Sequence, residues 1–543
     1  MKRILFFQLI LFLLFTGCGE FSGDEYIDSD NYVTRWISIS IEAPTETRSD
    51  LTRTPQFEEG SSKEHAIKSI SFYFFDSSEN SLAVGNDGKS YITFTNAEAT
   101  PDSNPSDSPE AIVKPALQLN FENKTPPSYV VVIINPTSAL QQREIKKIQD
   151  LRDIAEDYED TASLGFIMSN AVYKTSAGSK FEAVPITSQD LYATQEEAAR
   201  HPVSIFVERV VAKISMVVSN PTKKTDSGEL MYKTTNTDSG NEDIYVKLLG
   251  WSVTAKTDKT RLLKEINPGW DDRLFGGKEI WNDYANCRSY WAINAEEVEF
   301  NYLNFNDAQK IKYFEDSPDD SKANYTYVNE NAAKNWDGED SDVPTCIIAA
   351  AQLVDSSGKA LDYAEYGGKK YTKEGVLNLI ASGLPYYKKN NTENKYDHID
   401  PADLEFALND SEKVPAYVVK VRLKDKNTEW FINPETNPEE IVNDAIDAEL
   451  LSLCNKNRAK VWEEGHTYYY ADILHTGEAG SGEKGVVRNN HYRLTVTGIN
   501  GIGTPVFDPS QVIIPEQTQE TSLIINVDVI DWRLLKQSLE IAW

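Results

Sequence analysis

Apolar and polar residues alternate along many short segments of this chain. In the segment 37–43, Ile37, Ile39, Ile41 and Ala43 occupy every second position, and the residues between them are polar. A period of two places successive side chains on opposite faces of a strand. The segment is therefore predicted to be a strand with one buried face.

Nine further segments are rich in β-branched or aromatic residues and are bounded mostly by Pro, Gly, Asn and Asp, as strands are. They are 70–75, 91–95, 129–134, 205–218, 246–255, 417–423, 467–471, 492–497 and 523–530. Helical periodicity is found in 139–155 and in 439–453, which follows Pro438. Strands that come in runs favour antiparallel β-sandwiches over a doubly wound parallel sheet. The fold class is therefore predicted to be mainly β, with a few inserted helices.

The chain begins with basic residues, an apolar run over residues 4–15, and then Thr16-Gly17-Cys18. The run is too short to cross a bilayer as a permanent helix, and small residues end it directly before a cysteine. Residues 1–17 are therefore predicted to be a lipoprotein signal peptide, with lipidation at Cys18. Phe15 stands where such signals usually carry Leu or Val, so an ordinary secretory peptide is the alternative.

Lipid on Cys18 would hold the mature chain on a membrane while its body stays in water, because each buried CH₂ of an acyl chain contributes about 0.8 kcal/mol. The acidic, polar stretch 24–32 suits a solvated tether between the lipid and the body.

Charge and cysteine content exclude several classes of function. The formal net charge is -31 and the pI is near 4.7, which argues against binding to nucleic acid or to anionic lipid headgroups. Besides Cys18 the cysteines are Cys287, Cys346 and Cys454, with no CxxC pair. At most one internal disulfide can form, and the sequence leaves its pairing open.

No catalytic or cofactor motif stands out. The six histidines form neither HExxH nor a pairing with cysteine at zinc-ligand spacing, and the glycine-rich stretch 477–485 lacks a phosphate-binding ending. Acidic clusters at 315–320 and 337–342 could hold calcium, but neither has EF-hand spacing, and we interpret them as solvated loops. We expect no enzyme activity, no cofactor and no metal.

The length indicates more than one domain. More than 500 residues follow the signal, too many for one core of ordinary size. The polar interval 220–241 is the best boundary, giving an N-terminal domain of residues 49–220 and a C-terminal domain of residues 221–534. No internal repeat is evident.

Two segments stand outside these domains. Residues 44–55 are polar and carry Arg48 and Arg53, which no core pattern includes, so this segment is expected to be exposed. At the other end, Leu535, Leu539, Ile541 and Trp543 share one parity, interrupted only by Gln537. A terminus that alternates to its last residue is suited to join the sheet edge of another chain. The alternative is a last strand paired within its own domain.

Several segments together resemble a known family, the fimbrillins, which are type V pilus subunits of Gram-negative anaerobes. The similarity is greatest to the Mfa-type major subunit and covers nearly the whole chain. The segments that carry it are 207–213 (VERVVAK), 250–253 (GWSV), 417–422 (YVVKVR), 468–471 (YYYA), 486–492 (VVRNNHY) and 527–532 (VDVIDW).

The resemblance implies two transthyretin-like antiparallel β-sandwich domains, export as an outer-membrane lipoprotein, and assembly into an extracellular fimbrium that supports adhesion. It implies that an arginine-specific protease cuts after Arg48, or after Arg53, and so removes residues 18–48 with the first strand. The C-terminal strand 535–543 of one subunit then fills the vacated groove of the next. The linker before the arginine is longer than in the family and contains Pro44, so the arginine that is cut stays open.

The partners implied are identical subunits, accessory anchor and tip pilins, and the arginine-specific protease. Two alternatives remain. One is an uncut lipoprotein that anchors a pilus or serves at its tip as an adhesin, keeping its lipid and its first strand. The other is a surface glycan-binding lipoprotein or hydrolase.

Overall fold

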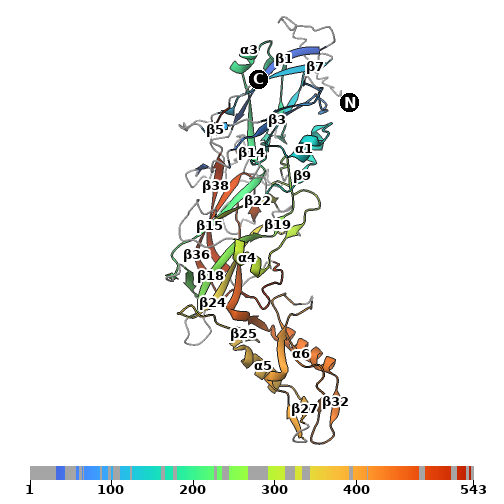
Figure 1. Cartoon of the computed structure of the whole chain (residues 1–543), viewed down its shortest axis with the longest axis vertical. Helices are drawn as coiled ribbons and strands as arrows, with labels where there is room; N and C mark the ends of the chain where they lie inside the picture. Colours follow the sequence, from blue (N-terminus) through green and yellow to red (C-terminus); the bar gives the residue numbers. More distant parts are fainter. Residues whose placement is uncertain are drawn as a thin grey trace, which may run out of the picture.

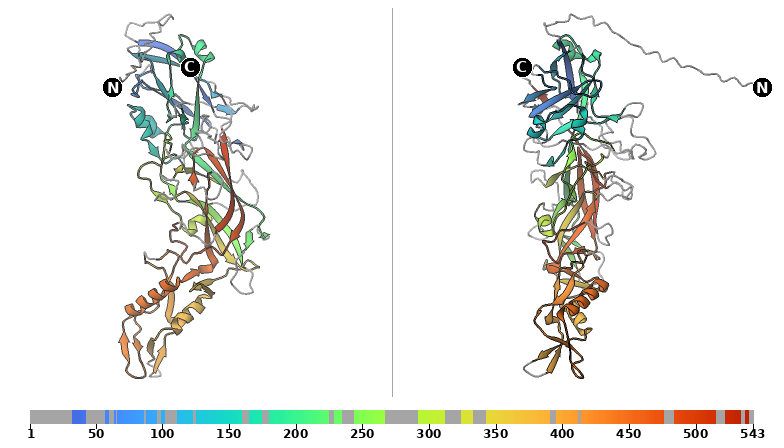
Figure 2. Two further views of the ribbon diagram at one scale, coloured as in Figure 1. Left: turned by 180° about the vertical axis from the view of Figure 1, so that it is seen from behind. Right: turned by 90° about the vertical axis from the view of Figure 1, so that its right-hand side faces the viewer.

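The computed structural model describes most of the chain in segments. These are residues 32–42, 57–59, 64, 66–85, 88–95, 99–101, 111–122, 125–159, 165–174, 180–224, 229–234, 244–266, 292–311, 324–332, 343–390, 395–411, 414–475, 484–514, 522–533 and 537–539. The molecule is elongated and has three parts in succession (Figure 1). A first β-sandwich forms one end, a second lies in the middle, and a smaller lobe that carries α5 and α6 forms the opposite end (Figure 2).

The first sandwich is built from nine strands over one core. They are β1 (Tyr32–Glu42), β3 (Ser69–Phe75), β4 (Tyr91–Thr95), β6 (Ala111–Val113), β7 (Ala116–Glu122), β8 (Tyr129–Ile134), β10 (Met168–Asn170), β13 (Val184–Pro185) and β14 (Val203–Arg209). The order is β4-β3-β8-β10-β14-β1-β6, with β13 on β8 and β7 on β1. The central strands β3 and β8 are buried nearly throughout, as expected for strands covered on both sides.

The second sandwich has two sheets. One has the order β2-β38-β36-β15-β22 and the other the order β16-β17-β18-β24-β34-β37. The first contains β2 (Phe57–Glu59), β38 (Ser522–Arg533), β36 (Asn490–Asn500), β15 (Val211–Val218) and β22 (Tyr325–Asn329). The second contains β16 (Lys223–Lys224), β17 (Leu230–Lys233), β18 (Tyr245–Thr254), β24 (Cys346–Val354), β34 (His466–Asp472) and β37 (Thr504–Pro505), with α4 (Phe305–Ile311) packed on β18 and β24. Apolar residues of both sheets form one core.

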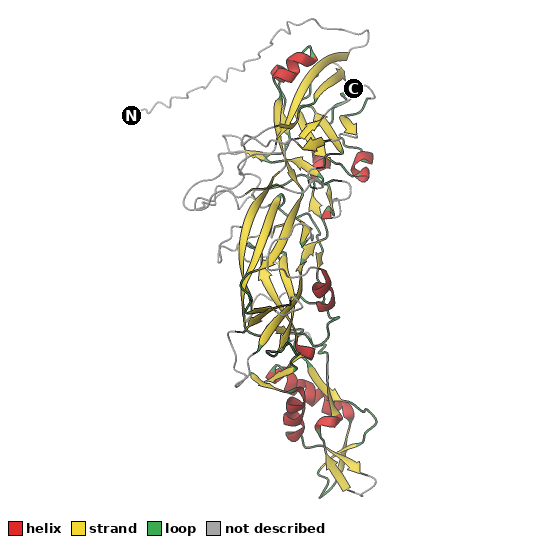
Figure 3. Ribbon diagram, turned by 60° about the vertical axis from the view of Figure 1, so that its left-hand side comes forward, coloured by secondary structure: helices red, strands yellow, loops and turns green. Residues whose placement is uncertain are grey.

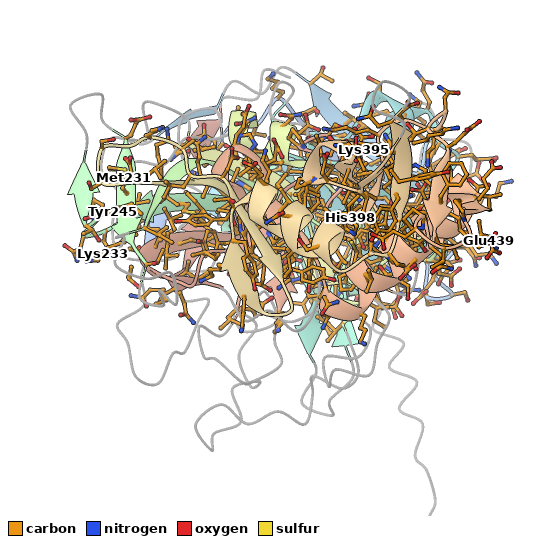
Figure 4. All side chains as sticks on the ribbon, turned by 90° about the horizontal axis from the view of Figure 1, so that it is seen from below. Met231, Lys233, Tyr245, Lys395, His398 and Glu439 are labelled. Atoms are coloured by element: carbon orange, nitrogen blue, oxygen red, sulfur yellow. The ribbon has the colours of Figure 1, made fainter. Side chains whose placement is uncertain are left out.

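The third lobe is inserted between β24 and β34 and has a core of its own. Two helices and several short strands form it (Figure 3). They are β25 (Tyr363–Tyr366), β26 (Lys369–Tyr371), α5 (Lys373–Ser382), β27 (Tyr387–Asn390), β28 (Lys395–His398), β29 (Leu404–Ala407), β30 (Lys420–Leu423), β31 (Trp430–Ile432), β32 (Glu439–Ile441), α6 (Asn443–Asn457) and β33 (Lys460–Trp462). Figure 4, seen from this end of the molecule, shows Lys395 and His398 on β28 apart from Lys233 and Tyr245, which lie opposite each other on β17 and β18 of the second sandwich.

Short elements complete the described chain. They are α1 (Ser138–Gln142), α2 (Ile148–Arg152), α3 (Gln195–Arg200), β5 (Ala99–Pro101), β9 (Ala155–Glu156), β11 (Tyr173–Lys174), β12 (Lys180–Phe181), β19 (Lys256–Thr257), β20 (Thr260–Arg261), β21 (Phe300–Asn301), β23 (Asn331–Ala332), β35 (Gly485–Val486) and β39 (Gln537–Leu539). Within the described segments, no helix has the length and apolar character needed to cross a bilayer.

The mainly β fold class is confirmed, and every predicted strand segment contains a strand. The bounds of β4 and β8 agree with the prediction to the residue. The predicted strand 205–218 is two strands, β14 and β15, which belong to different sheets. The sheets also contain parallel pairs, such as β1 with β14 and β15 with β36, which the antiparallel expectation did not include.

Both helix predictions need correction. The segment 139–155 forms two short helices, because Arg143 is extended and ends α1 before α2 begins. In the segment 439–453, the first three residues form β32, which pairs with β31, and the helix α6 begins at Asn443. Pairing with a neighbouring strand here overrides the local helical pattern.

The chain passes between the two sandwiches at residue 210, before the polar interval 220–241. Val210 and Val211 belong to the core of the first sandwich, whereas Ala212 belongs to the core of the second. The third lobe, with its separate core, was not predicted. Its apolar positions look like those of any other core in the sequence, and only the tertiary structure separates them.

Candidate functional site

The predicted first strand, β1, lies in the interior of the first sandwich. Ile37, Ile39 and Ile41 are 0% exposed and belong to its core. Ser38 and Ser40, which alternate with them, are only 1% exposed. The prediction of one buried face was therefore incomplete. Small neutral side chains allow the second face to be covered at modest cost, which charged ones would not.

The strand changes partner along its length. Its first half, from Tyr32 to Ser38, runs antiparallel to β7, and its second half runs parallel to β14 and also pairs with β6. The backbone N–H and C=O of Trp36 each form a 2.8 Å hydrogen bond with the backbone of Tyr192, and the N–H of Ile39 donates to the carbonyl of Pro115 at 3.0 Å. The helix α3 packs against both β1 and β7. The strand is thus held from several sides.

Side chains near the start of β1 also bind β7. The Thr34 hydroxyl donates to Asn120 Oδ1 at 2.6 Å, and the Tyr32 hydroxyl donates to Glu122. Further along, the Ser40 hydroxyl is buried with no hydrogen-bond partner among the described residues. That unsatisfied hydroxyl reduces the stabilisation gained from burying this part of the strand.

Removal of β1 would leave an apolar slot bordered by β6, β7 and β14. Val33 and the three isoleucines of β1 are all core residues. Each such side chain contributes about 1.5–3 kcal/mol when buried, so an empty slot would expose a large apolar surface to water. A strand of alternating apolar residues is the natural occupant.

The covalent link between β1 and the rest of the fold is residues 43–56. This link contains Arg48 and Arg53. One cut within it would separate β1 from the body of the protein. Ala43, Arg48, Arg53 and the lipidation candidate Cys18 lie outside the described residues.

The predicted donor strand is described only in its middle. There β39 runs antiparallel to β5, with Gln537 opposite Pro101 and Leu539 opposite Ala99. In the uncut chain these three residues therefore pair with another segment of the same chain. Leu535, Ile541 and Trp543 lie outside the described residues.

Other candidate sites are resolved only in part. Cys346 and Cys454 are free thiols buried in the second sandwich and in the third lobe. Burial raises the pKa of the Cys454 thiol to about 11 and that of the Cys346 thiol further still, so both are poor nucleophiles at neutral pH. Cys287, both acidic clusters and residues 477–483 lie outside the described residues. The described segments contain no group of three potential metal ligands.

Buried ion pairs near the passage between the two sandwiches are a feature that the sequence analysis missed. Lys264 Nζ lies 3.1 Å from Glu208, and neither side chain is exposed. Arg488 Nε lies 2.5 Å from Glu330, and Lys213 Nζ lies 3.1 Å from Glu64. The sequence feature that could have predicted these ion pairs is the presence of charged residues inside the apolar runs 207–213 and 486–492. A charge in such a run needs a partner when the run is buried.

The fold defines the class: a β-sandwich protein whose first strand is buried in the core and is joined to the body through residues 43–56. Residues 460–538 match the family described as "Major fimbrial subunit protein type IV, Fimbrillin, C-terminal". The resemblance to the fimbrillin family that was inferred from the sequence is confirmed for this part of the chain. The match supports a fimbrial protein of structural type. No curated protein sequence matches the chain.

Several solved structures align with most of the chain at low identity. A candidate cell adhesion protein from Parabacteroides distasonis is 13% identical, with a TM-score of 0.41 over 92% of this chain and 98% of its own. A fimbrilin from Porphyromonas gingivalis is 14% identical, with a TM-score of 0.35 over 92% and 98%. The tip fimbrial protein Mfa3 from Porphyromonas gingivalis is 10% identical, with a TM-score of 0.29 over 92% and 100%.

Proposed function

We propose that this protein is a structural subunit of a surface fimbria. The precursor is exported as a lipoprotein through Cys18 and is held at the outer membrane. An arginine-specific protease cuts after Arg48 or Arg53, and the first strand leaves. The C-terminal strand Leu535–Trp543 of a neighbouring subunit then fills the slot.

The observation that carries the proposal is the position of β1. It is buried as deeply as a core strand, yet a single cut in residues 43–56 would disconnect it from the body. Its alternating isoleucines match the alternation at the C-terminus, where Leu539, Ile541 and Trp543 share one parity. Strand addition of this kind combines main-chain hydrogen bonds with pockets for alternate side chains.

A joint of this kind is heterologous, because the slot of one subunit receives the tail of another. Head-to-tail contacts that do not close on themselves propagate into a filament. Four large apolar side chains, each contributing about 1.5–3 kcal/mol, together with a ladder of backbone hydrogen bonds, would make the joint very long-lived.

Proteolysis of the purified chain tests the central step. Treatment with an arginine-specific protease is expected to give a mature N-terminus at Ser49, or at Thr54 if Arg53 is cut, followed by ladders on a gel. The double variant Arg48→Ala with Arg53→Ala should stay uncut and monomeric, and Arg422→Ala serves as the control. Assembled fimbriae whose subunits all retain Ile37 to Ala43 would contradict the proposal.

Export as a lipoprotein is tested separately at Cys18. The variant Cys18→Ala should incorporate no radiolabelled palmitate, and it should accumulate as unassembled precursor. Equal incorporation of the label by the variant and the natural chain would show that Cys18 is not the lipidation site.

A second candidate function is an uncut anchor or tip subunit, and the pairing of β39 with β5 favours it. In such a subunit the C-terminal strand stays on its own chain and β1 stays in its slot. N-terminal sequencing of the surface-assembled protein separates the two: a chain beginning at Cys18 identifies an anchor or tip, and one beginning at Ser49 or Thr54 identifies a stalk subunit.

A further inference from the structure

The described residues 57–59, 64, 66 and 67, here called the junction strap, follow the predicted cut sites in the chain and contact both sandwiches. At one end, β2 runs parallel to the last residues of β38, with Phe57 opposite Asp531 and Glu59 opposite Arg533. At the other end, Ile67 is 3% exposed in the core of the first sandwich, just before β3. The chain thus passes from the second sandwich into the first within this short stretch.

Glu64 is the central anchor of the junction strap. Its side chain is 0% exposed, and its carboxylate lies 3.1 Å from Lys213 Nζ, on β15 of the second sandwich. The same carboxylate oxygen accepts a hydrogen bond of 2.6 Å from the hydroxyl of Tyr327, on β22. The Glu64 backbone carbonyl accepts a hydrogen bond of 2.9 Å from Arg209, the last residue of β14 in the first sandwich. One residue is therefore bound to strands of both sandwiches.

Tyr327 reinforces this anchor. Its ring packs against Phe166 of the first sandwich, with ring centroids 4.6 Å apart, although its strand belongs to the second. Burial, and then the adjacent Glu64 carboxylate, raise the pKa of the Tyr327 phenol far above its ordinary value. The phenol therefore keeps its proton and remains a donor to Glu64.

We propose that the junction strap remains on the body when β1 is released, and that Glu64 uses it to hold the two sandwiches and the new N-terminus together. The part concerning release rests on the proposed function. The two segments pair with different strands: β1 pairs with β6, β7 and β14, whereas β2 pairs with β38. Departure of β1 therefore breaks no strand pairing of the junction strap.

The new N-terminus would lead along the chain into β2, which pairs with the end of β38. A cut after Arg53 leaves Thr54 first, close before β2, and β2 lies on the end of β38, which leads into the C-terminal segment. In a filament, pulling force would enter through β38 and leave through the slot of the first sandwich. The junction strap connects β38 to the first sandwich through Glu64. It is a second connection between the sandwiches, besides the direct chain connection from β14 to β15.

Hydrogen exchange of the uncut chain tests the anchor without any polymerisation. The reporter is the peptide covering residues 209–213, where the chain leaves the first sandwich and the Val210 N–H donates to the backbone carbonyl of Ile167. Glu64→Gln should exchange at least tenfold faster in this peptide, because local opening no longer has to break a buried ion pair. Tyr327→Phe, a milder change that removes one hydroxyl, should exchange about threefold faster.

The matched control is Glu365→Gln, which removes the partner of Lys460 within the third lobe and should leave the reporter peptide unchanged. The anchor role would be overturned by two results together. Tyr327→Phe would exchange at the rate of the natural chain, and Glu64→Gln would either do the same or exchange faster in every peptide by as much as in the reporter.

Exchange after cutting tests the fate of the junction strap. When the natural chain is cut by an arginine-specific protease and β1 is removed in mild urea, residues 57–59 and 67–69 should keep their protection. Loss of protection in both segments would overturn the proposal. A protease that fails to release β1 would instead contradict the proposed function, while the result for Glu64→Gln on the uncut chain would stand.

Discussion

Buried charged residues form hydrogen bonds and ion pairs where the two sandwiches meet. Arg488 is 0% exposed, and besides Glu330 its guanidinium donates to the backbone carbonyls of Leu262 at 3.1 Å and Arg261 at 2.7 Å. Burying an ion pair gains little net free energy, but removal of one partner leaves a desolvated charge behind. Such a residue therefore fixes the geometry of the junction more than it adds to stability.

Replacement of Arg488 by Ala should destabilise the protein by about 3–5 kcal/mol, because Glu330 would remain buried without its partner. Urea unfolding followed by tryptophan fluorescence measures this. Arg422→Ala is the control: its partner Glu405 is on the surface, with side chains 49% and 35% exposed, so the change should be about 0–1 kcal/mol. A loss below about 1 kcal/mol for Arg488→Ala would mean that water reaches Glu330 and replaces the arginine.

At the scale of elements, each sandwich contains a turn of the same kind after a core strand. The sequence analysis did not identify these two turns as a repeat. Asp76 follows β3, and its carboxylate accepts from the N–H groups of Ser78 and Asn80 at 2.8 and 2.9 Å. Asp355 follows β24 and accepts in the same way from Ser357 and Lys359, at 2.7 and 3.0 Å. The same side-chain capping therefore ends a core strand in each sandwich.

The C-terminal strand is the element with the sharpest test. Deletion of residues 535–543 should leave both sandwiches folded, as judged by circular dichroism, but should abolish polymerisation of the cut chain. Leu539→Asp with Ile541→Asp should do the same, because two carboxylates in apolar pockets cost several kcal/mol each. Ser538→Asp, of opposite parity, is the control and should still polymerise. Heat-resistant ladders from the double variant would place the strand within its own domain.

At the scale of the whole molecule, the third lobe is joined to the second sandwich through a narrow connection. The chain enters it along β25 and leaves along β33, and these strands pair, with Tyr363 opposite Trp462. The two ends of the inserted segment are therefore adjacent. The lobe lies at the end opposite β1 and contributes no described residue to the slot (Figure 1).

Residues 365–460 should be replaceable by a short glycine-rich turn. The two sandwiches are expected to keep their free energy of unfolding within about 1 kcal/mol, because shortening a loop changes its closure entropy only slightly. Urea unfolding reported by Trp251, which is buried in the second sandwich, measures this. Failure of the shortened chain to fold would mean that the lobe supports the second sandwich.

The sequence by itself determined where several of the core strands lie. Alternation and β-branched content are local properties, so β4 and β8 could be placed to the residue and β1 could be identified as a strand with buried isoleucines. The terminal patterns and the family resemblance, later confirmed for residues 460–538, are also properties of the sequence.

The tertiary structure decided which strands pair and what the buried charges do. Ile39 lies opposite Val203, and Arg488 binds Glu330, 158 positions away in the chain. No local pattern encodes such distant partners, because register and charge compensation arise only when the strands are packed together. For the same reason, the separate core of the third lobe and the bonds of Glu64 to both sandwiches became visible only in the folded chain.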